Sequence, residues 1–187
     1  MALIISNAYL SQSQMTDNAQ YIADYLINKG WTRNAIAGIL GNMQRESTLN
    51  PGLWESLIYG NMSGGYGLVQ WTPATGYTSW ADARGYPWGN NYGNTTAYFN
   101  GQLECILWEV ANNQQWIATS SFNFSFSAFT KSVESPEYLA EAFMRNYERP
   151  GVLALEERSQ NARYWFENLT YGSSTVIKNA VEWAVAI

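Results

Sequence analysis

Two residue counts limit the chemistry that this chain can perform. Its 187 residues include no histidine and a single cysteine, Cys105. A Ser-His-Asp triad and a Cys-His pair are therefore excluded, as is a structural zinc site, which takes about four Cys or His ligands. Fifteen aspartates and glutamates remain. We therefore expect acid–base chemistry to run on carboxylates, with tyrosine or lysine as the other options, and we expect no metal or cofactor.

Glu46 stands out among these acids by its place in a helical pattern. It follows Met43 by three residues and Ile39 by seven, which puts it on the apolar face of its helix. Burial and the negative end of the helix dipole both disfavour an ionised carboxyl at such a position. A carboxyl that stays protonated near neutral pH can act as a general acid. The alternative is a helix that frays early and turns Glu46 outward.

Helical signals dominate the chain around this pattern. The helix of Glu46 is expected to begin after Thr32, as its N-cap, and to end near Ser47, before a turn at 50–52. An earlier helix is expected from Thr16, as its N-cap, to about Lys29. Further helices are expected over about 74–84, 100–112, 136–147 (with Ser135 as its N-cap) and 156–168.

Two glycines lie inside the helix that carries Glu46. Gly38 and Gly41 are three residues apart, and each costs about 1 kcal/mol of helix stability relative to alanine. Their spacing therefore indicates close approach, either of another helix or of a ligand. Cys105 precedes Ile106, Leu107 and Trp108, and we expect it to be a small buried side chain.

The stretch between about residues 52 and 98 is rich in glycine, asparagine and aromatic residues. Its segment 63–71, with the sequence Ser-Gly-Gly-Tyr-Gly-Leu-Val-Gln-Trp, gives the clearest strand signal, around Tyr66–Trp71, and predicts a small β-hairpin. Aromatic faces beside amide side chains suit sugar rings, which stack on the faces and hydrogen-bond to the amides. The alternative is that these aromatic residues form the core.

The overall composition narrows the partners. A net charge of −5 leaves no basic surface for nucleic acid or for anionic lipid, so neither is expected as a partner. The first residues lack the basic and apolar segments of a signal peptide, and no run approaches the ~18 apolar residues of a membrane span. With 47% hydrophobic residues, the chain can bury the core of one domain.

The order of four motifs resembles a known family. The segment 44–51, Gln-Arg-Glu-Ser-Thr-Leu-Asn-Pro, resembles the Glu-Ser-x-x-Asn-Pro signature of lysozyme-like lytic enzymes, which include soluble lytic transglycosylases and goose-type lysozyme. Segment 66–71 resembles their Gly-Leu-Met-Gln segment, with Val69 in place of Met. The similarity is stronger to the phage tail lysozyme domain, over about residues 5–170. Its motifs recur here in order as Gly41-Asn42-Met43-Gln44, Asn50-Pro51-Gly52-Leu53-Trp54, Gly67-Leu68-Val69-Gln70-Trp71-Thr72-Pro73 and Tyr147-Glu148-Arg149-Pro150.

This resemblance implies a mainly α, lysozyme-like domain over residues 1–170 that cleaves peptidoglycan between N-acetylmuramic acid and N-acetylglucosamine. Glu46 falls on the family's catalytic acid. Glu148 and Glu55 are candidates for a second carboxyl or for support of the site. Glu148 has two structural alternatives, an ion pair with Arg145 or Arg149 and a hydrogen bond to the loop after Pro51. The candidate substrate-binding residues are Ser47, Asn50, Trp54, Tyr66, Gly67, Gln70, Trp71 and Tyr147.

Several alternatives stay open. The product could be that of hydrolysis or of a lytic transglycosylase, and a rival hypothesis is a non-catalytic glycan-binding tail module. The protein could be a lysin of the virion tail tip, with other phage tail proteins as partners, or an endolysin released by the host; we expect a monomeric domain. Residues 171–187 are expected to form a linker and the start of a helix leading to a further domain such as a peptidase, or else an ordinary C-terminal helix.

Overall fold

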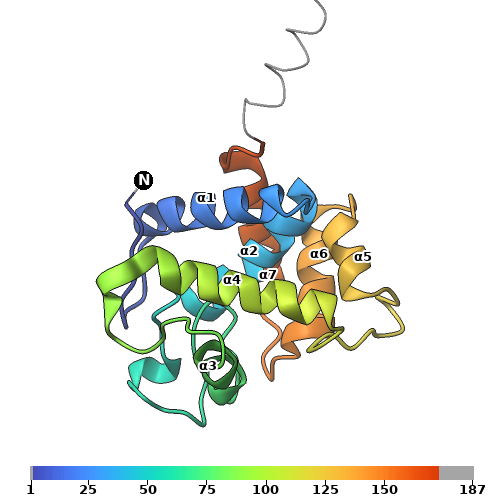
Figure 1. The fold of residues 1–187 in the computed structure, drawn as a ribbon. Helices are drawn as coiled ribbons and strands as arrows, with labels where there is room; N and C mark the ends of the chain where they lie inside the picture. Colours follow the sequence, from blue (N-terminus) through green and yellow to red (C-terminus); the bar gives the residue numbers. More distant parts are fainter. Residues whose placement is uncertain (1, 173–187) are drawn as a thin grey trace, which may run out of the picture.

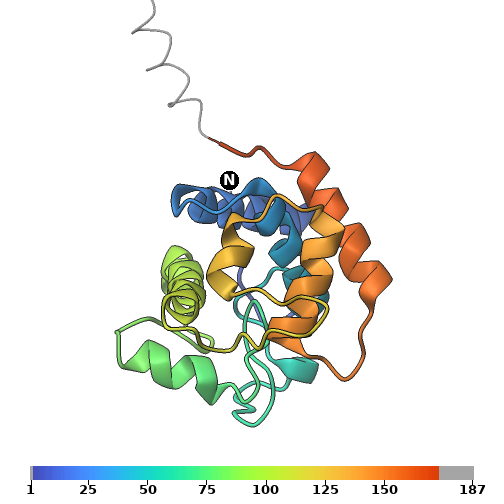
Figure 2. The same ribbon diagram turned by 90° about the vertical axis from the view of Figure 1, so that its right-hand side faces the viewer.

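The structure, a computed structural model, describes residues 2–172, and helices make up most of it (Figures 1 and 2). A mainly α-helical fold is therefore confirmed. Two short 3₁₀ turns cover Glu55–Leu57 and Tyr92–Asn94, and a π-helical turn, Met144–Glu148, continues α6 directly. The α-helices are α1 (Gln12–Asn28), α2 (Arg33–Ser47), α3 (Thr75–Asp82), α4 (Thr95–Ala111), α5 (Phe126–Lys131), α6 (Pro136–Phe143) and α7 (Leu155–Asn168).

Helix α2 is the central element of the fold. Ten of its 15 residues are buried, and α1, α5, α6 and α7 all contact it (Figure 2). A Cβ atom on Gly38 would lie 2.9 Å from Leu139 Cβ of α6, and one on Gly41 would lie 2.8 Å from Ala162 Cβ of α7. Both glycines therefore serve close helix packing, the first of the two uses expected from their spacing.

Local capping signals predicted helix starts with mixed success. Thr32 accepts a hydrogen bond from the Ala35 backbone N–H at 3.1 Å, and Ser135 accepts one from the Tyr138 N–H at 3.2 Å, so both predicted N-caps are confirmed. Thr16 as the N-cap of α1 is wrong. Ser11 caps that helix in a reciprocal pair with Gln14, which satisfies two backbone donors and starts the helix earlier. Helix α5 was not predicted.

The predicted β-hairpin around Tyr66–Trp71 is also wrong. Residues 2–172 contain no strand, and only isolated bridges join Tyr66 to Trp54 and to Trp71. Gly67 (φ +81°) and Gln70 (φ +48°) turn the backbone too soon for a ladder. The Leu68 N–H donates instead to the side chain of Gln102 in α4, at 2.8 Å. The segment is thus a loop, held by two backbone hydrogen bonds between Tyr66 and Trp71 and by side chains such as that of Gln102.

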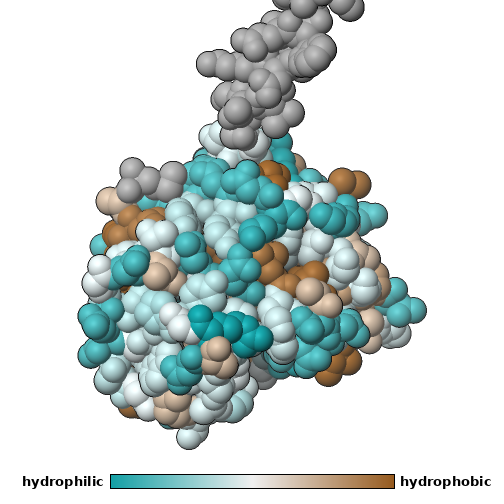
Figure 3. All heavy atoms as spheres, in the orientation of Figure 1, coloured by the Kyte–Doolittle hydropathy of each residue, from teal (hydrophilic) through white to brown (hydrophobic). Residues whose placement is uncertain are grey.

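Many aromatic residues of the 52–98 stretch belong to the core, which bears out the core alternative for those residues. The buried ones include Trp54, Tyr66, Tyr77 and Tyr98. Cys105 is buried as well, as expected. On the face drawn in Figure 3, hydrophilic residues predominate and hydrophobic ones form small separate groups. Of the helices that the structure describes, none has the length and apolar character needed to cross a bilayer. The linker and helix were expected over residues 171–187, and from residue 173 onward this segment lies outside the described residues.

Candidate active site

A cleft of about 500 Å³ opens where three segments meet. They are the C-terminal end of α2, the loop between α2 and α3, and the π-helical turn with the residues that follow it. All three acids singled out in the sequence, Glu46, Glu55 and Glu148, line this cleft. Four of the eight candidate substrate-binding residues line it too, namely Trp54, Gln70, Trp71 and Tyr147. The fold thus brings together residues up to about a hundred positions apart.

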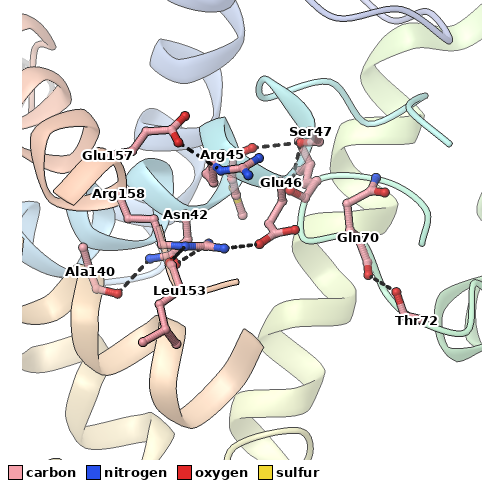
Figure 4. Close-up of polar contacts among 12 residues, drawn as sticks. Asn42, Arg45, Glu46, Ser47, Gln70, Thr72, Ala140, Leu153, Glu157 and Arg158 are labelled. Carbon is pink, nitrogen blue, oxygen red and sulfur yellow. Dashed lines mark hydrogen bonds and ion pairs between the residues drawn. The ribbon is translucent and has the colours of Figure 1, made fainter. Parts of the chain in front are cut away.

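Glu46 reaches the cleft from the last turn of α2, which is intact and does not fray. Its side chain is 20% exposed, and its Oε1 accepts a hydrogen bond from Arg158 Nη2 at 2.6 Å (Figure 4). The Arg158 side chain is only 2% exposed. A charge-assisted hydrogen bond to a buried guanidinium is short and strong, and it restrains the carboxyl that accepts it. Glu46 is therefore held in place by a charge that the sequence pattern did not indicate.

Three helices fix the Arg158 guanidinium. Arg158, in α7, donates through Nη1 to Asn42 Oδ1 of α2 at 2.8 Å and through Nε to the Leu153 carbonyl at 2.9 Å. Asn42 in turn donates to the Ala140 carbonyl of α6 at 3.0 Å (Figure 4). Each nitrogen of the guanidinium thus has an acceptor, and the direction of the Glu46 contact is set by the packing of α2, α6 and α7.

Glu148 is the second carboxyl of the cleft and has no such partner. Arg145 pairs with Glu141 at 2.6 Å, and Arg149 donates to the Gln115 and Asn146 carbonyls, so neither expected ion pair forms. Glu148 Oε1 is buried and has no hydrogen-bond partner among the described residues. Desolvation, followed by the charge of Glu46, raises the pKa of Glu148 well above its usual value. The two carboxyls therefore sit in opposite environments.

The π-helical turn is the feature that places Glu148. The Arg149 N–H closes the turn onto the Met144 carbonyl at 2.7 Å, and the extra residue of a π turn changes which side chains face inward. Tyr147 is 1% exposed and points into the protein, while Glu148 borders the cleft. Such turns occur often at functional sites.

Glu55 has a structural role in the loop. Its Oε2 accepts the Gly65 N–H at 2.8 Å, and its own N–H donates to the Gly65 carbonyl at the same distance. This pair of hydrogen bonds closes the 55–65 segment on itself. Although Glu55 lines the cleft, its carboxyl is occupied by the backbone.

Gln70 and Trp71 form part of the loop side of the cleft. Gln70 has a left-handed backbone (φ +48°), and its Nε2 donates to the Leu53 and Gly67 carbonyls at 3.0 Å each. Trp71 Nε1 donates to Glu109 Oε1 at 2.9 Å, and Tyr147 Oη donates to Oε2 of the same carboxyl at 2.6 Å. Glu109, in α4, was not singled out in the sequence.

The other four candidate binding residues lie off the cleft and support the loop. Ser47 Oγ donates to the Leu68 carbonyl at 2.9 Å, and Asn50 Nδ2 donates to the Ser6 and Ala8 carbonyls. Tyr66 is buried and accepts the Gly89 N–H, and a Cβ on Gly67 would lie 2.6 Å from Gln102. These side chains shape the loop backbone and make no cleft surface.

Arg158 is a residue that the sequence could have revealed. Arg158, Ala162 and Trp165 are the buried residues of α7, at helical spacings of four and three. A charge on an otherwise apolar stripe needs a partner, and Glu46 on the stripe of α2 needed one too.

Within residues 2–172, no group of three or more His, Cys, Asp or Glu side chains is placed to hold a metal ion.

Comparison with known proteins gives concordant results. The family model for phage tail lysozyme matches residues 17–169. The chain is also 52% identical over 174 residues to "Morphogenesis protein 1" of Bacillus phage B103. That alignment covers 93% of this chain and 45% of the relative, so the chain spans about half of the relative's length. On the extent of the family match, this chain belongs to the phage tail lysozyme family.

Proposed function

We propose that this chain is a lysozyme-like glycosidase that cleaves peptidoglycan between N-acetylmuramic acid and N-acetylglucosamine, with Glu46 as the general acid. The observation that carries the proposal is the placement of Glu46, which the central helix presents to a cleft and the buried Arg158 orients. The family to which the chain belongs supports a peptidoglycan-acting enzyme. The motif around residues 44–51 supports Glu46 as its acid.

The acid step requires a proton on Glu46 when the glycosidic bond breaks. Glu148 lines the same cleft, and burial together with the charge of Glu46 raises the pKa of Glu148 well above its usual value. We assign Glu148 as the second carboxyl of the site.

We assign the glycan contacts to the side chains that border the cleft. Trp54, Trp71 and Tyr147 border the cleft, and Gln70 places there an amide that is held by two backbone carbonyls. Aromatic and amide groups in this combination suit the acetamido sugars of the glycan strand. Ser47, Asn50, Tyr66 and Gly67 contribute by holding the loop that carries these groups.

Hydrolysis is the proposed outcome, and lytic transglycosylation is the alternative. In hydrolysis, water adds to the anomeric carbon and leaves a free reducing end. In transglycosylation, the 6-hydroxyl of the muramic acid attacks instead, its proton returns to the glutamate, and an anhydro ring forms. Mass spectrometry of digested peptidoglycan separates the two, because an anhydro-muramic product is lighter by one water.

The experiment that tests catalysis is peptidoglycan digestion by the wild type and by three variants. We expect Glu46→Gln to lower the release of soluble muropeptides by at least about 100-fold, because general acid catalysis contributes about 10²–10⁴-fold. Glu148→Gln should reduce the rate and Glu55→Gln should leave it near the wild-type value. Glu156→Gln, at an exposed acid of α7 that hydrogen-bonds to Gln160, is the control for a lost negative charge.

A non-catalytic glycan-binding module is the rival hypothesis. It predicts that the wild type binds peptidoglycan and releases no soluble fragments, and that Glu46→Gln binds as the wild type does. Release of fragments by the wild type, and its loss in a folded Glu46→Gln variant, would reject this rival. Lysis that survives in Glu46→Gln would reject Glu46 as the acid.

We further propose that the domain acts as a monomer on the cell wall as part of the virion tail, next to other tail proteins. The name of the phage B103 relative, a morphogenesis protein, supports a virion role over that of a released endolysin. Detection of the protein in purified virions by mass spectrometry tests this. Its presence only in the lysate of the host would favour an endolysin.

A further inference from the structure

A third carboxyl, Glu109, lies behind the cleft and joins two of its walls. It belongs to the last turn of α4, is 6% exposed, and accepts one hydrogen bond on each oxygen. Trp71 Nε1 donates to Oε1 at 2.9 Å, and Tyr147 Oη donates to Oε2 at 2.6 Å. Trp71 comes from the loop between α2 and α3 and Tyr147 from the π-helical turn. One carboxyl therefore links three segments of the chain.

A carboxylate at this position is costly for stability. Both of its partners are neutral donors, and no ion pair with Glu109 is found in the part of the chain that the structure describes. Desolvation exceeds the opposing effect of the two hydrogen bonds and raises the pKa of Glu109 to about 7. A buried side chain that served packing alone would be apolar, since an unpaired charge there destabilises the fold.

Packing and hydrogen bonds both restrain the two rings. Trp71 stacks on Tyr77, with centroids 5.0 Å apart and planes at 24°, and Tyr147 stacks on Phe143, at 4.4 Å and 20°. Both rings are almost fully buried, so their neighbours already limit their movement. A hydrogen bond at the ring edge adds a directional contact to this packing, and Glu109 supplies one to each ring.

We infer that Glu109 is a positioning residue that holds Trp71 and Tyr147 together as one rigid part of the wall of the glycan-binding cleft. The inference rests on the proposed function, since it assigns to Glu109 a part in binding that same glycan. Glu109 has no place in the cleft lining and acts only through these two side chains.

The titratable groups around Glu109 are few. Cys105 lies one turn earlier on α4, and Tyr147 and Glu148 approach from the π-helical turn. Burial raises the pKa values of Cys105 and Tyr147 far above neutrality, although the positive charge of Arg84 partly opposes this at Cys105. Between pH 5 and 8, the titration of the Trp71 contact can therefore come from Glu109 or from Glu148.

The first test follows the Trp71 indole N–H by proton–nitrogen correlation spectroscopy between pH 5 and 8. We expect its resonance to move with a midpoint near pH 7, to stay still in Glu109→Gln, and to keep its titration in Glu148→Gln. The indoles of Trp116 and Trp165, which donate to the Phe124 carbonyl and to Gln44, are internal controls that should not move. A Trp71 indole that does not titrate in the wild type, or that titrates in Glu109→Gln, overturns the inference.

The second test compares glycan affinity in two Glu109 variants at a temperature where both are folded. Glu109→Gln keeps an acceptor for Trp71 and a polar contact for Tyr147, whereas Glu109→Met has a similar length and keeps neither. We expect Glu109→Met to raise the KM for peptidoglycan and the Kd for an N-acetylglucosamine oligomer by about tenfold, with kcat within about threefold. Glu109→Gln should restore both constants to within about threefold of the wild type.

The outcomes separate this inference from the proposed function. If the wild type binds and cleaves while Glu109→Met matches it in KM and Kd and only unfolds more easily, Glu109 is structural and the inference is wrong. If the wild type neither binds nor cleaves glycan, the proposed function fails with it, and the indole titration alone then reports whether Glu109 orders Trp71.

Discussion

At the scale of single residues, two arginines of α7 have different surroundings, and only the buried one contacts the site. Arg158 is buried in the interface of α7 with α2 and α6 and serves three acceptors. Arg163, five residues on, is 64% exposed and pairs with Glu137 and Glu167 on the surface. An exposed pair adds little to stability because water screens it and two long side chains lose freedom. Only Arg158 therefore couples stability to the geometry of Glu46.

Replacement of each arginine by lysine should expose this difference. A lysine ammonium is a single point and cannot serve three acceptors arranged around a planar fork. We expect Arg158→Lys to lower the free energy of unfolding by about 2 kcal/mol, the size of a lost hydrogen bond to a charged group, and to lower peptidoglycan cleavage. Arg163→Lys should change stability by less than about 0.5 kcal/mol. Equal effects in urea denaturation would show that Arg158 has no special role.

At the scale of elements, the position of Arg158 depends on how closely α7 approaches α2. Gly41 sets this distance, because a Cβ there would lie 2.5 Å from the Arg158 carbonyl and 2.8 Å from the Ala162 nitrogen. Both contacts are backbone atoms, which cannot rotate away. The helices must separate to admit a side chain, and the guanidinium of Arg158 would move with α7.

Alanine at Gly41 should therefore weaken both the fold and the site. Overpacking costs about 1–3 kcal/mol, which outweighs the gain of about 1 kcal/mol in helix propensity. We expect Gly41→Ala to lower the melting temperature and the activity per folded molecule. Gly76→Ala in α3 is the matched control, since the nearest atom, Trp71 Cβ, lies 4.0 Å away. A Gly41→Ala protein as stable as Gly76→Ala would mean that α2 and α7 do not need this closeness.

Features set by interactions between residues close in the sequence were predicted, and features set by distant residues were missed. Signals within a few residues identified the extent of α2, its cap at Thr32, and Glu46 on its buried face. The hairpin prediction failed because the pairing of Tyr66 with Trp71 goes no further. The carbonyl of the neighbouring Gly65 accepts the Glu55 N–H instead, a contact that no local pattern reveals. Glu109 escaped notice for the same reason, since its partners lie on other elements, whereas Arg158 could have been noticed as a charge on the apolar stripe of α7.

At the scale of the whole molecule, the region of the cleft gathers buried and half-buried carboxyl groups in a protein that is already acidic. Glu46 and Glu148 line the cleft and Glu109 lies behind it, and within residues 2–172 Glu46 alone of these three has a cation in contact. Glu148 and Glu109 both have raised pKa values. The negative charge of Glu109 is one of the causes that raise the pKa of Glu148. The folded protein therefore binds more protons than the unfolded chain between the usual glutamate pKa and neutrality.

Because of this proton uptake, the free energy of unfolding should fall as pH rises. A carboxyl whose folded pKa is raised from 4.5 to about 7 stabilises the fold below pH 4.5, and this contribution is lost as pH rises through 7. For Glu109 the loss between pH 5.5 and 8 amounts to about 2 kcal/mol. We expect urea denaturation to show a wild type that is less stable at pH 8 than at pH 5.5. The range starts at 5.5 because the isoelectric point, about 4.7, brings low solubility.

Glu109→Gln should remove the share of this pH dependence that belongs to Glu109, because an amide does not titrate, and should leave the share of Glu148. Glu156→Gln, which removes an exposed carboxyl of α7, should keep the wild-type slope and so controls for the change in net charge. Glu148→Gln should flatten the slope only in part, since Glu109 still titrates in that variant. A wild type whose stability rises from pH 5.5 to 8 would mean that Glu109 is already ionised in the folded protein at the lower pH, and that its contacts with Trp71 and Tyr147 outweigh its burial.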